Sequence, residues 1–125
     1  MDVNFHLKSL DPWADLGDDG RLNGYRRFTT LKKSHPHLRT LLCVGGWKKA
    51  NLTLRKEFAT ESAEFLKQFE FDGLNLLWDF PGDLERGGTK EDKENFPLLL
   101  REMSKVYREN NLYLSVTLRT KDWMV

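Results

Sequence analysis

The sequence predicts an α/β fold built around a parallel sheet. Two apolar runs, residues 38–44 and 73–80, are each followed by a Gly-Gly or Pro-Gly pair, as is typical of buried strands. The segments between the strands carry apolar residues at helical spacing, and each strand-to-strand unit is roughly 30 to 40 residues long. Strands that alternate with helices in this way form parallel sheets with right-handed crossovers. The pattern suits a doubly wound sheet or part of an eight-stranded barrel.

Four strands are expected in this sheet. The first is short and is followed by a turn-rich loop over residues 10–20. The others are stronger, with continuous apolar or alternating character. The expected strands are Phe5 to Leu7, Leu38 to Val44, Gly73 to Phe80 and Tyr113 to Leu118.

Three helices are expected between these strands. The first ends before Pro36, because the residue before a proline disfavours helical backbone. The third begins near Thr89 and Asp92, which resemble a capping box. Their apolar faces are, in chain order, Leu22, Tyr25, Phe28 and Leu31; Phe58, Phe65, Leu66 and Phe69; and Phe96, Leu99, Leu100, Met103, Val106 and Tyr107.

The composition limits the kinds of partner and cofactor that can be expected. The 20 Lys and Arg residues nearly cancel the 19 Asp and Glu residues, so a net charge of +1 gives no electrostatic reason to expect nucleic acid or an anionic membrane. No stretch approaches the length of an apolar membrane span. No Gly-rich nucleotide fingerprint follows a strand, and His6, His35 and His37 are too scattered for a metal site. We therefore expect neither a cofactor nor a metal.

Cysteine usage and targeting signals leave the compartment open. Cys43 is the single cysteine, so no disulfide can form within the chain, and its place in an apolar run predicts a small buried residue. No basic region followed by a long apolar run is visible at the start, so no signal peptide is recognised. Residues 51–53, Asn-Leu-Thr, form a glycosylation sequon at Asn51, which has meaning only in a secreted protein.

Two strand ends carry motifs. Residues 41–47 read Leu-Leu-Cys-Val-Gly-Gly-Trp, and residues 71–82 read Phe-Asp-Gly-Leu-Asn-Leu-Leu-Trp-Asp-Phe-Pro-Gly. They resemble the third-strand Ser-x-Gly-Gly and the fourth-strand Asp-Gly-x-Asp-x-Asp-x-Glu of glycoside hydrolase family 18, the latter followed there by Tyr-Pro-Gly. Residues 10–13, 24–28 and 92–96 also look like this family. The similarity runs in the right order and spacing through nearly all of the chain.

The resemblance implies a (β/α)8 barrel with its site at the carboxyl ends of the strands. It also implies that residues 1–125 form a partial catalytic-type domain covering about the second to fifth strands, and that the protein is secreted. An arc of four strands leaves two open edges and a half-covered inner face. We expect such a segment on its own to be marginally stable or prone to aggregation unless it dimerises.

The acidic positions of the fourth-strand motif are altered. Side chains alternate along a strand, so Asn75, Leu77 and Asp79 share one face, which the resemblance places toward the barrel interior. In this family the final Glu protonates the leaving oxygen, while the substrate's own N-acetyl carbonyl attacks the anomeric carbon and the Asp two residues earlier orients it. Asp72 keeps the first acidic position, and the other three positions depart from the motif.

Leu77 is the most severe departure, because leucine offers neither an acceptor for the acetamido N–H nor a negative charge for the developing cation. Asp79 is an acid, but it is one methylene shorter than Glu, which retracts the carboxyl by roughly 1 Å. Asn75 keeps hydrogen bonding and loses the charge. Normal chitinase hydrolysis is therefore not expected.

Other motif residues admit two interpretations each. Trp47 follows Gly45 and Gly46 into the loop where the resemblance implies the mouth of a sugar site, so these three are the candidate substrate-binding residues. The glycines equally well permit close packing at a strand end, and packing is the default role for Trp47 and Trp78 alike. Asp72, at the start of its strand, is explained slightly better by hydrogen bonds to turn amides than by a chemical role.

Three functions follow from these residues. The first is a chitinase-like protein that binds chitin or N-acetylglucosamine oligosaccharides and has lost hydrolysis. The second is a weakly active chitinase in which Asp79 is a poor acid. The third is a truncated, non-catalytic fragment or an interaction module. The sequence does not indicate the oligomeric state.

Overall fold

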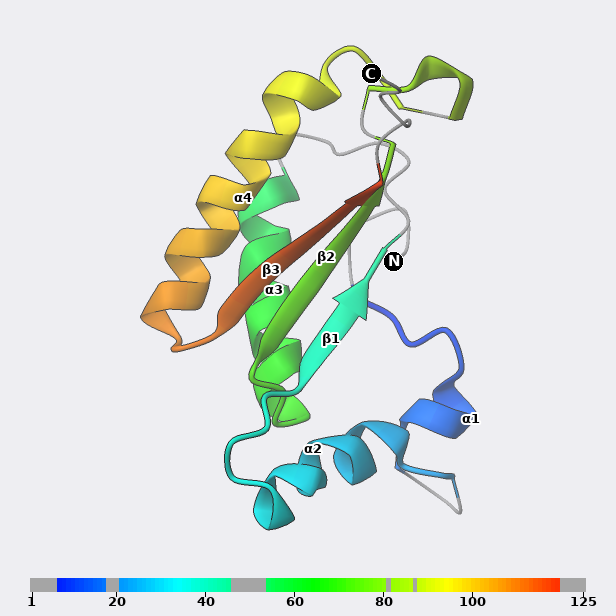
Figure 1. The fold of residues 1–125 in the computed structure, drawn as a ribbon, viewed down its shortest axis with the longest axis vertical. Coiled ribbons are helices and arrows are strands. Elements are labelled where there is room, and N and C mark those ends of the chain that lie inside the picture. Colours follow the sequence, from blue (N-terminus) through cyan, green and yellow to red (C-terminus); the bar gives the residue numbers. More distant parts are fainter. Residues whose placement is uncertain (1–6, 18–20, 46–53, 81, 87, 120–125) are drawn as a thin grey trace.

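A computed structural model of the chain describes residues 7–17, 21–45, 54–80, 82–86 and 88–119. Its elements, in chain order, are α1 (Pro12–Asp15), α2 (Gly24–Ser34), β1 (Leu41–Val44), α3 (Arg55–Gln68), β2 (Gly73–Asp79), the 3-10 helix η2 (Leu84–Arg86), α4 (Asp92–Glu109) and β3 (Tyr113–Arg119). The three strands form one parallel sheet in the order β1-β2-β3 (Figure 1). The alternation of strands and helices predicted from the sequence is confirmed.

The expected first strand, at residues 5–7, falls outside the described residues except for Leu7, which is not part of a strand. The second expected strand begins at Leu41 rather than at Leu38. The reason is local: the Leu38 amide donates to the His35 carbonyl in a turn, and Thr40 is engaged by a side chain from the start of β2. The expected loop near residue 12 contains a single helical turn, α1, whose first amides are capped by the Asp11 carboxylate.

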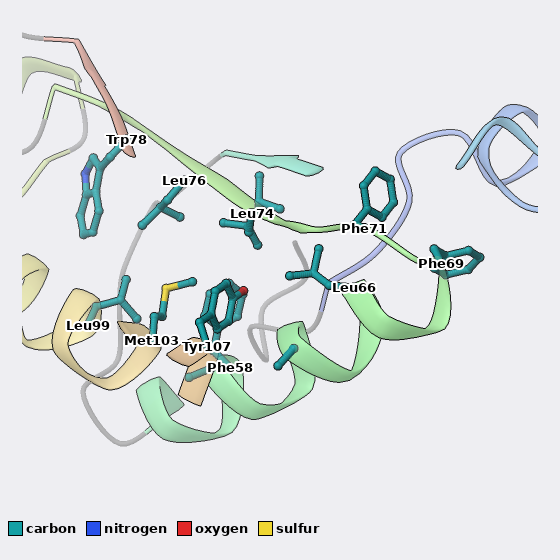
Figure 2. Packing of buried hydrophobic residues seen from close by; sticks show 13 residues of the cluster. Phe58, Leu66, Phe69, Phe71, Leu74, Leu76, Trp78, Leu99, Met103 and Tyr107 are labelled. Atoms are coloured by element: carbon teal, nitrogen blue, oxygen red, sulfur yellow. The ribbon is translucent and has the colours of Figure 1, made fainter. Parts of the chain in front are cut away.

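Helices α3 and α4 cover one face of the sheet, and no described helix lies over the other (Figure 1). Leu74, Leu76 and Trp78 point from β2 into the layer between sheet and helices, where Figure 2 shows them facing side chains of both helices. All three are at most 3% exposed. The Trp78 ring packs edge-on against Phe96, with ring centroids 4.7 Å apart, so the packing role expected for Trp78 is confirmed.

A second apolar cluster joins α2 to the end of α3. The Tyr25 ring meets Phe65, Phe69 and Phe71 edge-on, with ring centroids 6.0, 5.2 and 5.5 Å apart. Burial, together with its interaction with Asp15, raises the pKa of Tyr25 to about 12. This cluster fixes α2 beneath the amino-terminal end of the sheet.

One of the two hydrogen bonds of the expected capping box is present at the start of α4, from the Thr89 amide to the Asp92 side chain. The buried Asp92 carboxylate accepts hydrogen bonds from the Thr89 amide, at 2.9 Å, and from the Thr89 hydroxyl, at 2.8 Å. It also accepts one from the Gly82 amide, at 3.0 Å. Asp92 therefore connects the loop after β2 to the first turn of α4, which fixes the chain just beyond the carboxyl end of β2.

Candidate functional site

The motif residues of β2 divide between the two faces of the sheet. Asn75 and Leu77 are partly exposed and Asp79 is exposed, whereas the residues between them are buried against the helices. The three altered motif positions therefore lie together on the face that no described helix covers, as the alternation of the strand predicts.

Asn75 lies at the centre of a polar cluster that spans all three strands. Its side-chain oxygen accepts a hydrogen bond from the Ser115 hydroxyl, at 2.7 Å, and its amide nitrogen donates to the Thr117 hydroxyl, at 3.1 Å. The same nitrogen lies 3.6 Å from the Cys43 sulfur. Both ends of the amide are thus engaged by neutral groups, so this part of the open face carries no charge.

Leu77 places an aliphatic side chain two residues further along the same face. It lies beside Gly45 at the end of β1: a Cβ added to Gly45 would be 3.5 Å from the Leu77 Cδ2 atom, an ordinary contact. Close packing therefore does not require glycine at position 45. The position where the resemblance implies a carboxylate is occupied by an apolar group.

Asp79 is the last residue of β2 and is paired in the sheet with Arg119 of β3. The strand ends immediately after it, since Phe80 takes a left-handed backbone conformation with φ of 53°. Asp79 is therefore at the carboxyl end of the sheet, the end where barrels of this architecture carry their sites.

Asp72 lies at the opposite end of the strand. One of its carboxylate oxygens accepts from the Thr40 amide, at 2.7 Å, and from the Thr40 hydroxyl, at 3.0 Å. The other accepts from the Lys32 ammonium group, at 3.1 Å. These bonds connect α2, the start of β1 and the start of β2. Asp72 therefore has a structural role and lies away from the other motif residues.

Of the remaining sequence predictions, one is wrong and others concern residues that the structure does not describe. The prediction that Cys43 is buried is wrong: the residue is exposed, because it lies on the uncovered face of β1. Gly46, Trp47 and Asn51 lie outside the described residues. Within the parts of the chain that the structure describes, no three His, Cys, Asp or Glu side chains are grouped as metal ligands. Across those same parts, no helix combines the length and apolar character that a membrane span needs.

Ser115 and Thr117 are site residues that the sequence did not reveal. Both lie in β3, which the sequence predicted only from its apolar and β-branched residues. No sequence pattern indicates that they lie next to position 75. The register does: Asn75 is opposite Ser115, and Leu77 is opposite Thr117.

The fold and the site together define a class of protein. Parallel strands backed by helices, with the polar side chains of three strands gathered on the uncovered face, form part of a (β/α)8 barrel. The family model for glycosyl hydrolases family 18 matches residues 1–125. The chain belongs to this family.

Individual relatives agree with this assignment. A Drosophila melanogaster protein named probable chitinase 2 is 40% identical over 118 residues, which is 87% of this chain and 24% of that protein. The Group IV chitinase of Ostrinia furnacalis superposes with a TM-score of 0.80 at 29% identity, covering 93% of this chain and 33% of that one. Catalytic domain 2 of the Group II chitinase of the same species, a mutant in complex with penta-N-acetylchitooctaose, superposes with a TM-score of 0.77 at 30% identity, covering 90% of this chain and 31% of that one. The chain thus spans about a quarter to a third of these proteins.

Proposed function

We propose that this chain is part of a chitinase-like protein that binds chitin or chitooligosaccharides without hydrolysing them. The observation that carries the proposal is the position of Leu77, which lies on the open face of β2 between Asn75 and Asp79. Family membership supports the substrate class, and the solved relative in complex with a chitooligosaccharide adds to that support.

The loss of hydrolysis follows from what Leu77 cannot supply. In the mechanism that the family resemblance implies, this position orients the substrate's acetamido group and stabilises the positive charge that develops on the sugar ring. Removing one preorganised electrostatic group of this kind typically costs on the order of a hundredfold in rate. The side chains that bond Asn75, the next residue on this face, are the neutral hydroxyls of Ser115 and Thr117, so they do not supply the missing charge. Asp79 adds a second cost, because its carboxyl is retracted by roughly 1 Å relative to Glu.

We also propose that the protein is secreted. The sequon at Asn51 supports this, as does membership in a family to which relatives named probable chitinase 2 and endochitinase are similar. Glycosylation at Asn51 in the protein isolated from its source, detected by mass spectrometry before and after deglycosylation, is the expected result.

Rescue of activity tests the lost hydrolysis. In the full-length protein that contains this chain, the double substitution Leu77→Asp and Asp79→Glu should raise chitooligosaccharide turnover by orders of magnitude. Leu77→Asn with Asp79→Glu is the matched control, because asparagine has the size of aspartate and none of its charge. Rapid turnover by the unaltered protein would contradict the proposal and favour a weakly active or competent enzyme.

Retention on chitin tests binding separately. The full-length protein should be retained on chitin beads, and Trp47→Ala should reduce that retention, because we propose that this side chain faces the sugar. Absence of retention by the unaltered protein would remove the binding function. It would leave an interaction module that reuses the barrel scaffold.

A further inference from the structure

Asp92 places a buried carboxylate in the first turn of α4. It is 7% exposed, whereas Glu91 and Glu94 beside it in the sequence are exposed. All three acids lie near the amino-terminal end of the helix, where the dipole favours negative charge, and the two exposed acids have that benefit without losing water. A buried carboxylate is unfavourable unless hydrogen bonds replace the water that it loses. The burial of Asp92 is therefore explained by the groups that bond to it.

The groups that bond Asp92 come from two points of the β2–α4 loop, whose described residues are 82–86 and 88–91. The Oδ2 atom accepts hydrogen bonds from the Gly82 amide, at 3.0 Å, and from the Thr89 amide, at 2.9 Å. The Oδ1 atom accepts one from the Thr89 hydroxyl, at 2.8 Å. A single carboxylate on α4 thus holds the loop both where it leaves the sheet and where it approaches the helix.

Backbone hydrogen bonds shape the β2–α4 loop itself. The Asp83 amide donates to the Phe80 carbonyl, at 3.1 Å, and the Gly88 amide donates to the Asp83 carbonyl, at 2.8 Å. These bonds run along the loop rather than from the loop to the helix. Leu84 is 62% exposed, so its burial does not attach the loop to the core. Removing the Asp92 carboxylate would therefore take away a polar attachment that connects the loop to α4.

The β2–α4 loop is also connected to the end of the sheet where the candidate site lies. Figure 1 shows this loop beyond the carboxyl ends of the strands. The bond from Asp83 reaches Phe80, which directly follows Asp79 and turns the chain out of the strand with a φ of 53°. A shift of the loop would change the direction in which the chain leaves β2. The position of the loop thus influences the position of Asp79.

We propose that Asp92 is a positioning residue for the carbohydrate site at the carboxyl end of β2. Its hydrogen bonds hold the β2–α4 loop in the arrangement that a chitooligosaccharide binds. Asp92 acts through the loop rather than by touching the sugar, because its carboxylate is buried and already bonded to Gly82 and Thr89. When only a fraction of the molecules keep the loop in place, the apparent affinity falls by that fraction. This inference rests on the proposed binding of chitin or chitooligosaccharides.

The affinity of the full-length protein for chitopentaose, measured by calorimetry well below the unfolding temperature, tests this role. Asp92→Ala removes all three hydrogen bonds and should weaken binding on the order of tenfold, as expected if about one molecule in ten keeps the loop in place. Asp92→Asn should bind within about threefold of the unaltered protein, because its oxygen still accepts from both backbone amides and its NH2 group can donate to the Thr89 hydroxyl.

Two further variants separate positioning from stability. Ser62→Ala removes a buried hydrogen bond to Tyr107, near the other end of α4, and should leave the affinity within about twofold because it is distant from the loop. Asp92→Ser is a milder change than Asp92→Ala: it keeps a hydroxyl at the start of the helix and loses the second oxygen. It should weaken binding in the same direction, and it provides the test if the alanine variant does not fold.

Amide hydrogen exchange without sugar gives a second measurement that does not depend on binding. Asp92→Ala should speed exchange at Gly82 and Thr89 by about tenfold or more and leave the amides of β2 unchanged. Unchanged exchange or unchanged affinity in this variant would overturn the role of Asp92 alone. Equal weakening by Asp92→Ala and Ser62→Ala, or by Asp92→Ala and Asp92→Asn, would overturn it as well. If the unaltered protein bound no chitopentaose, the proposed function would be wrong, and this role would be lost with it.

Discussion

Asp72 and Asp79, the two acidic residues at the positions of the fourth-strand motif, lie at opposite ends of β2. Asp72 directly precedes the strand and is bonded to Thr40 and Lys32, whereas Asp79 is its last residue. At about 3.3 Å per residue the two are separated by roughly 23 Å. A single sugar-binding site at the carboxyl end of the sheet can therefore include Asp79 and not Asp72.

The substitution Asp72→Asn is expected to destabilise the fold. Asparagine keeps one acceptor oxygen, but it loses the ionic bond to Lys32 and weakens the two bonds from Thr40, so a loss of about 1 to 3 kcal/mol in the free energy of unfolding is expected. Urea unfolding of the full-length protein measures this loss. Lys32→Met is the control and should cost less, because the Thr40 bonds remain. An unchanged unfolding midpoint for Asp72→Asn would show that these bonds contribute nothing.

The same residue predicts a pH dependence. Burial by itself raises the pKa of Asp72, but the hydrogen bonds from Thr40 and Lys32 outweigh it and hold the pKa below its ordinary value of 3.8. A carboxyl with a depressed folded-state pKa contributes stability above its unfolded-state pKa and loses it as the pH falls through the folded-state pKa. The stability difference between the unaltered protein and Asp72→Asn should therefore be constant near neutral pH and shrink below about pH 4. A difference that persists at pH 2 would contradict this account.

Gly73 is expected to be intolerant of any side chain. A Cβ at this position would lie 2.1 Å from the Tyr113 carbonyl oxygen on β3, and a backbone atom in a paired strand cannot move aside. Gly73→Ala should separate β2 from β3 and cost about 3 kcal/mol or more in unfolding free energy. Gly45→Ala is the matched control: its methyl group would make only ordinary contacts with Leu77, so a change within about 0.5 kcal/mol is expected.

Ser62 and Tyr107 form a buried polar link in the contact between α3 and α4. The buried Tyr107 hydroxyl donates to the Ser62 hydroxyl at 2.8 Å, and the Ser62 hydroxyl donates to the Ala59 carbonyl at 3.1 Å. Ser62→Ala leaves a buried hydroxyl without this acceptor and should cost about 1 to 3 kcal/mol, whereas Tyr107→Phe should cost about 1 kcal/mol. The double variant should cost less than the sum of the two by at least about 0.5 kcal/mol. Additive losses in thermal or urea unfolding would show that the two groups are not coupled.

Much of the fold was predictable because it rests on local patterns. The period of apolar residues located α2, α3 and α4, and the strong strand around residue 75 differs from β2 by only one residue at its end. The start of β1 was misplaced, since Leu38 is apolar yet turns back toward His35. Cys43 was predicted to be buried because an apolar run does not reveal which of its faces is covered.

The candidate site was predictable only in part. Alternation along one strand placed Asn75, Leu77 and Asp79 together, because that relation is contained within a single segment. The partners of Asn75 come from β1 and β3, and their identity depends on the register of two crossovers.

The sequence by itself determined the family resemblance, the helical and strand segments, and the loss of an acid at Leu77, because these are properties of residue identity and short-range period. Tertiary structure alone decided that Asp72 connects α2 to the sheet and that Ser115 and Thr117 hold Asn75. Each of these depends on which distant segments the parallel sheet brings together, and because parallel strands are joined by long crossovers, the residues of one strand do not show which residues lie opposite them.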